Sequence, residues 1–348
     1  CMLLIHQSER DLRFAPWSAL AEGHRLGRAE ALNDARMLAI TLALELLFLH
    51  RYGPYERAER RTREIEQLHL QGAYTFNSPW LWIYRARNAL AQGRLDDAER
   101  TLLETLPADT IYVNFRQDSL GQLVQALLGR IAWMRGDAVA TAAHVAPLQQ
   151  GVPMLLLEIQ AGAHVDAALA EHALGQGARA LEMLENAREL ADDEELVHLG
   201  MLAAAVQVEL AARDGDLRLA QTTAAGMDLP SSWSLAQAPF ALPWVCVEAL
   251  GRASVQLSLA RGEPMAALGT SQTLFALAQS AGQRLGELTA LVLQARAVFS
   301  AQGPRPAMAV LEVALVLGAE TGAIQPFLAM GAELMALLRQ WLASSRLP

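Results

Sequence analysis

Lysine is absent from this sequence: all 28 basic residues among its 348 are arginines. A Walker A phosphate-binding loop needs a lysine, and so does an enzyme that works through a Schiff base, so both classes are excluded. Cysteine is nearly absent too, with only Cys1 and Cys246 and no CxxC spacing. That scarcity argues against a disulfide framework or a cysteine-rich zinc site, and it is typical of a protein in a reducing cytoplasm.

Charged residues make up only 19% of the chain, against 53% hydrophobic residues, and the net charge is −9. Because contacts to phosphates dominate nucleic-acid affinity, this acidic chain is not expected to contact DNA directly. The longest apolar run, residues 37–48, is interrupted by Glu45. It is far shorter than the roughly 20 residues needed to cross a bilayer. We therefore expect a cytoplasmic protein without a membrane-spanning helix.

The common catalytic motifs are also missing. The sequence contains no HExxH, no GxSxG and no paired Cys/His cluster, so neither a zinc hydrolase nor a serine hydrolase is indicated. His164 and His172 share one face of a predicted helix, but at 1.5 Å rise per residue they lie roughly 12 Å apart, too far for one metal ion. We expect no enzymatic activity, no metal site and no cofactor bound by this chain.

What the sequence does contain is a repeat. Glycines recur at intervals of 40, 43, 39, 40, 47 and 41 residues, and an alanine follows five residues after most of them. A glycine can end one helix in a left-handed turn, and a small residue one turn into the next helix lets the two pack closely. The glycines are Gly53, Gly93, Gly136, Gly175, Gly215, Gly262 and Gly303, and the alanines are Ala58, Ala98, Ala180, Ala220 and Ala267.

This repetition predicts an all-α fold. We expect a right-handed superhelix of tetratricopeptide-like helical hairpins, about seven to eight repeats of ~40 residues, forming one domain over residues 1–348. The clearest unit has one helix from Trp80 to Gln92, a turn at Gly93 and a second helix that begins near Asp96. It resembles the tetratricopeptide repeat, and Trp82 occupies the position of that repeat's packing tryptophan.

Candidate ligand contacts come from two sources. In hairpins of this kind the first helix lines the concave groove, so its ninth and twelfth positions face a ligand. Aromatic residues are also concentrated between residues 74 and 115, and they offer flat faces to a ligand. A solvated groove wall and plain core packing stay open as alternatives. The apolar loop at residues 226–243 either packs over the solenoid or lies across its groove. The candidates are Trp80, Tyr84, Arg87, Arg130, Trp133, His172, Glu209, Arg252 and Gln256.

A more specific signal lies near the C-terminal end, where residues 309–338 read AVLEVALVLGAETGAIQPFLAMGAELMALL. A helix that ends in an alanine- and leucine-rich run, then a glycine, then F-L-x-x-G-x-x-L-x-x-L-L, resembles the end of the sensor domain of MalT-type regulators. These are large ATP-dependent activators of the LuxR type. The matching residues are Leu311, Ala314, Leu315, Gly322, Phe327, Leu328, Gly331, Leu334, Leu337 and Leu338.

The resemblance implies a function. In these regulators a small inducer binds the superhelix, relieves autoinhibition and allows ATP-dependent oligomerisation. ATP belongs to an N-terminal ATPase domain and DNA to a C-terminal helix-turn-helix, so we expect this chain, which begins at Cys1, to be a fragment of a longer regulator. Its partners would be a small-molecule inducer, other domains of the same regulator and a second copy of itself. The alternative is a tetratricopeptide-type adaptor that binds a peptide or protein in its groove.

Overall fold

The computed structural model describes residues 21–22, 25, 35–70, 78–105, 119–149, 156–227, 242–329 and 331–344, and no strand occurs among them. Seven helical hairpins follow one another in these segments. Their helices are α3 (Ala35–Tyr52) with α4 (Tyr55–Leu70), α5 (Ser78–Ala91) with α6 (Leu95–Thr105), α7 (Ser119–Met134) with α8 (Ala138–Val145), α10 (Ala167–Ala173) with α11 (Gly177–Asp193), α12 (Val197–Asp214) with α13 (Leu217–Gly226), α14 (Trp244–Ala260) with α15 (Pro264–Ala281), and α16 (Arg284–Gln302) with α17 (Pro304–Thr321).

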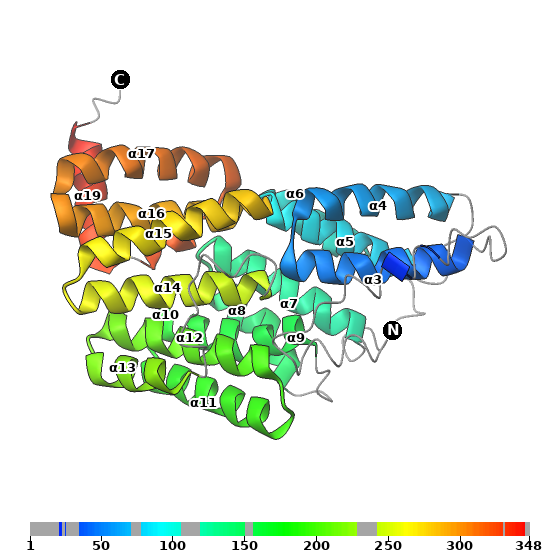
Figure 1. Cartoon of the computed structure of the whole chain (residues 1–348), viewed down its shortest axis with the longest axis horizontal. Coiled ribbons are helices and arrows are strands. Elements are labelled where there is room, and N and C mark those ends of the chain that lie inside the picture. The colour runs from blue at the N-terminus through cyan, green and yellow to red at the C-terminus, as the bar shows by residue number, and fades with distance from the viewer. Residues whose placement is uncertain are drawn as a thin grey trace.

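Shorter elements complete the chain. The 3-10 helix η2 (Ala146–Gln149) extends α8, while α9 (Leu157–Gln160) and the π-helical segment η3 (Ala161–Asp166) run directly into α10. The chain then closes with α18 (Gln325–Leu328) and α19 (Gly331–Ser344). Each hairpin packs against the next (Figure 1), so the predicted all-α superhelix of tetratricopeptide-like repeats is confirmed.

The glycine and alanine register is confirmed as well. All seven repeat glycines have positive φ angles, between 73° and 85°, which is the region that favours glycine. The five alanines that follow them are completely buried between the two helices of their hairpins. Two turns show how the next helix begins: after Gly136 and Gly215, the side chains of Asp137 and Asp216 accept hydrogen bonds from backbone N–H groups three residues on.

Trp82 differs from the expectation. The tetratricopeptide resemblance gives it a packing role, yet its side chain is 39% exposed and lies under the guanidinium of Arg85, 4.6 Å from the ring centroid. Packing in this hairpin comes instead from Ile83, Ala86 and Ala89, which are buried in the main core.

The turn register leads to a first testable prediction. We expect Gly136→Val to lower the free energy of unfolding by about 3 kcal/mol, because valine is strained at φ +79° and its Cβ would lie 2.8 Å from Leu328 Cδ1. Gly177→Val is the matched control: a Cβ there meets only His172 Cδ2, at 3.9 Å, and we expect a loss under about 1 kcal/mol. Thermal unfolding followed by circular dichroism measures both, and equal midpoints would contradict the register.

The two ends of the superhelix meet. Helix α3 contacts α14, α5 contacts α16, and α7 contacts α18, and Figure 1 shows the blue and cyan N-terminal hairpins beside the yellow and orange C-terminal ones. The backbone N–H of Ile324 donates to Met134 O at 2.8 Å. At Gly93 the approach is close enough that an added Cβ would lie 2.4 Å from Thr321 Cγ2. We call these contacts between the N-terminal and C-terminal hairpins the seam.

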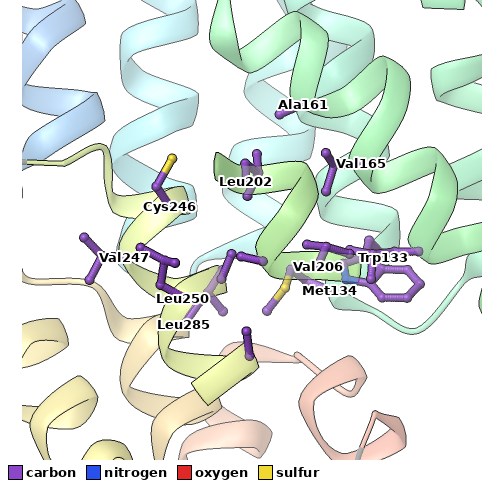
Figure 2. Close-up of a cluster of buried hydrophobic side chains, with 14 of the residues drawn as sticks. Trp133, Met134, Ala161, Val165, Leu202, Val206, Cys246, Val247, Leu250 and Leu285 are labelled. Carbon is purple, nitrogen blue, oxygen red and sulfur yellow. The ribbon is translucent and has the colours of Figure 1, made fainter. Parts of the chain in front are cut away.

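The main core runs through the array from α5 to α19, and a smaller cluster fills the first hairpin. Figure 2 shows side chains from α7, η3, α12, α14 and α16 gathered in one part of the main core. Among the described helices, none is both long and apolar enough to cross a membrane. Most of the loop predicted at residues 226–243 lies outside the described residues.

Candidate ligand-binding cavity

A cavity of about 170 Å³ lies inside the superhelix, on the concave side formed by the first helices of the hairpins. Its described lining comes from α3, α4, α5, α7, α9, η3, α10, α12, α14 and α16, so both ends of the array contribute to it. Most of the wall is aliphatic, including Leu127, Met134, Leu157, Val165 and Leu202. A concave, largely apolar site with a few polar groups is typical of small-molecule binding.

The helix on one side of the cavity is irregular. Residues 157–173 are helical throughout, but Ala161–Asp166 form a π-helical segment in which Ala161, Val165 and Asp166 line the cavity. A π segment inserts an extra residue into an α-helix and is found frequently at functional sites. Gly162 allows it to pack closely on α7, because an added Cβ would lie 3.0 Å from Ala126 Cβ. The irregular turn therefore places an acidic residue at the cavity.

Two arginines share one carboxylate at the N-terminal side of the cavity. Arg51 Nε and Nη2 donate to the two carboxylate oxygens of Glu158, each at 2.9 Å, and Arg87 Nη2 donates to Glu158 Oε1 at 3.0 Å. Burial raises the pKa of Glu158, but the charges of Arg51 and Arg87 outweigh it and hold that pKa below its usual range. Arg87 Nη1 is buried and has no hydrogen-bond acceptor among the described residues. Leaving a buried charged donor unsatisfied costs about 1–3 kcal/mol or more.

A second charged cluster lies between α7, η3, α12 and α14. Arg130 Nη1 donates to Asp166 Oδ1 at 3.0 Å, while its Nη2 is 3.7 Å from Glu248 Oε1. Arg252 donates to Glu209 and to Glu248, each at 2.8 Å. Burial raises the pKa of Asp166, and the charge of Arg130 only partly offsets it.

The charges of the cavity do not balance. On its N-terminal side Arg51 and Arg87 share the single carboxylate of Glu158, which leaves a formal excess of one positive charge there, whereas Arg130 and Arg252 face the carboxylates of Asp166, Glu248 and Glu209. His50 adds none at neutral pH, because burial and the charge of Arg87 lower its pKa to about 3. A chain of net charge −9 therefore has a cationic interior at this point.

Three of the nine predicted contacts line this cavity: Arg87, Arg130 and Arg252. Trp133 and Glu209 line a smaller adjacent hollow of about 30 Å³ that shares Arg130 and Arg252 with it.

The structure does not bring the other four predicted contacts to either hollow. Trp80 and Tyr84 pack from α5 against the first hairpin, where Tyr84 donates to Ala43 O at 2.9 Å. His172 contacts Asp214 at 2.9 Å, and Gln256 accepts from Arg296 Nη1.

Sequence reasoning missed four charged residues of the cavity: Arg51, Glu158, Asp166 and Glu248. For two of these residues, the neighbouring sequence contains a pattern that could have identified them. Glu158 follows the apolar run MLLL, and Glu248 is the only charged residue in LPWVCVEALG. A lone carboxylate inside a run that must be buried needs a cationic partner nearby, so such residues predict an internal ion pair.

Comparison with protein-family models gives a match. A family model described as the MalT-like TPR region matches residues 148–344. This covers the last four hairpins together with α18 and α19, and therefore one wall of the cavity. A search of the curated proteins finds no match.

Proposed function

Because the chain belongs to the MalT-like TPR region family, we propose that it is the effector-binding sensor domain of a bacterial MalT-type transcriptional activator. A small-molecule inducer would bind in the cavity inside the superhelix. The observation that supports this proposal most directly is the composition of the cavity: an apolar wall with a few convergent charged groups, to which all seven described hairpins contribute residues.

The seam suggests how binding would be coupled to a response. Tyr55 and Arg87 line the cavity from the N-terminal hairpins, whereas Trp244 and Gln283 line it from the C-terminal ones. A ligand that contacts both sets binds only while the two ends are together, so it stabilises the closed arrangement over an open one. Small rotations at each hairpin interface add up along a solenoid, which makes such an opening accessible.

The remaining features of the proposal follow from the family. The chain itself would carry no cofactor and catalyse no reaction; ATP binding and DNA binding would belong to other domains of the same cytoplasmic regulator. Inducer binding would relieve contacts with those domains and permit self-association of the regulator.

An adaptor that binds a peptide is the competing function. A peptide-binding groove must be open along the array so that an extended chain can lie in it. Here the N-terminal and C-terminal hairpins meet at the seam, and the concave face forms a cavity of about 170 Å³. This closure favours a small molecule over a peptide.

The experiment is a thermal-shift screen of this chain against sugars, aromatic acids, fatty acids and other metabolites. A compound that binds only the folded state stabilises it by about 2.7 kcal/mol at one hundred times its Kd, which raises the unfolding midpoint measurably. A reproducible rise with one class of compound would support the sensor. A flat response across the panel, together with capture of a defined protein partner, would replace it with the adaptor.

A further inference from the structure

We infer that the cavity binds a small organic monoanion, a carboxylate with a compact apolar body, and that Arg130 receives the carboxylate. This inference depends on the proposed function and specifies the chemical class of its ligand. Three independent features of the cavity lead to it: the free donors of Arg130, the unbalanced charge, and the size and polarity of the wall.

Arg130 is the arginine most available to a ligand. Its side chain is 22% exposed, compared with 12% for Arg252 and 2% for Arg51, and it lines both the main cavity and the adjacent hollow. Only its Nη1 makes a hydrogen bond to a described residue; Nη2 stays 3.7 Å from Glu248. A guanidinium with free N–H groups in a planar fork matches a carboxylate, which can accept two parallel hydrogen bonds.

The charge of the cavity sets the charge of the ligand. One anionic group balances the excess of Arg51 and Arg87 over Glu158, whereas a phosphate ester, with close to two charges, exceeds it. Arg87 contributes to this excess without contacting the ligand directly, because its unpaired Nη1 is covered by protein atoms. Its field still lowers the energy of an anion held by Arg130 across an apolar interior.

The size and polarity of the cavity wall determine the body of the ligand. A volume of about 170 Å³ holds on the order of ten water-sized groups, so the body is compact. Away from the charged clusters the lining includes Leu127, Leu157, Val165, Leu202 and Leu285, while the Tyr55 hydroxyl and the Trp244 indole N–H, which also line it, already donate to His50 O and Glu248 Oε2. A sugar would bury several hydroxyl groups against these side chains without hydrogen-bond partners, which is unfavourable. An aliphatic or aromatic body meets no such penalty.

The test compares acids with their neutral amides on the whole chain. Calorimetric titrations use phenylacetate against phenylacetamide and isovalerate against isovaleramide, with glucose and maltose as neutral sugars. We expect at least one acid to bind about tenfold more tightly than its amide or better. Equal binding of each acid and its amide would overturn the inference. This comparison uses the unmodified chain, so it does not depend on whether a variant folds.

Variants then assign the anion to Arg130. Arg130→Gln should weaken the acid about tenfold and leave the amide unchanged, whereas Arg135→Gln, which removes an ion pair with Glu99 on the outer surface, should change neither. If Arg130→Gln unfolds because Asp166 loses its partner, the double variant Arg130→Gln/Asp166→Asn removes both charges and gives the same readout. Unchanged acid affinity in a folded variant would refute the role of Arg130.

The outcomes also distinguish a failure of this inference from a failure of the proposed function. Binding of a neutral sugar in the cavity, with no binding of either acid, would refute the ligand class and leave the sensor function standing. No binding by any compound, including the wider screen, would remove support from both.

Discussion

Replacing Glu158 with glutamine is expected to lower the free energy of unfolding by about 3–5 kcal/mol, the cost of breaking a buried ion pair by removing one partner. The carboxylate holds two guanidiniums at once, from Arg51 and Arg87, whose side chains are only 2% and 8% exposed. Without it these two positive charges repel each other in an interior with few other anions. Equilibrium denaturation of the two proteins in urea measures the difference.

Two controls test the physical reason. Arg51→Met should cost less than Glu158→Gln, because Glu158 keeps its bond to Arg87 at 3.0 Å and no positive charge is left unpaired. Glu99→Gln removes a carboxylate from an ion pair on the outer surface, where the Glu99 side chain is 37% exposed. Its cost in the free energy of unfolding should stay below about 1 kcal/mol. If all three substitutions cost the same, Glu158 does not act as the shared partner of two buried arginines.

The same interaction has a definite dependence on pH. The two arginines depress the pKa of Glu158 in the folded chain below its ordinary value of 4.5, so the ionised carboxylate stabilises the fold at neutral pH. This contribution is complete above pH 4.5 and is lost as the pH falls toward the depressed folded value. The difference in the free energy of unfolding between the natural chain and Glu158→Gln should therefore become smaller in acid. A difference that becomes larger would contradict a lowered pKa of Glu158 in the folded chain.

The repeat could be predicted from sequence because its signals are local. Gly93 and Gly215 must adopt a positive φ whatever surrounds them, and Ala98 and Ala220 must be small wherever two helices touch. Each of these requirements acts within a few residues and recurs at each hairpin. The fold class and the turn positions therefore followed from spacing alone.

The cavity could be predicted only in part. Arg87, Arg130 and Arg252 were found because they occupy equivalent positions on the first helices of regular hairpins. Asp166 was missed because it lies in the π segment between α9 and α10, which interrupts the helical period that the count assumes. Trp80 and Tyr84 illustrate a different limit: an aromatic cluster fits a core as well as a ligand site, and here it packs the first hairpin.

Closure of the superhelix could not be predicted at all, because it depends on the sum of small rotations at each hairpin interface. The closure can nevertheless be tested by substituting glycines. We expect Gly93→Ala to destabilise the chain by about 2–5 kcal/mol: about 1–2 from the strain of alanine at φ +73°, and about 1–3 from the clash of its Cβ with Thr321 Cγ2 across the seam. Thermal unfolding measures the loss, and small-angle scattering shows whether the radius of gyration increases.

Gly215→Ala separates the two contributions, since Gly215 has a similar φ of +85° but an added Cβ meets nothing within 4 Å. It should lose only the strain, and its radius of gyration should not change. Thr321→Ser removes the clashing methyl group and keeps the hydroxyl that donates to Leu317 O, so it should rescue Gly93→Ala and leave Gly215→Ala as it was. Such coupling between residues so far apart in sequence arises only if the two ends touch in solution. Additive effects of Gly93→Ala and Thr321→Ser would mean that the superhelix is open, and with it the cavity that both proposals require.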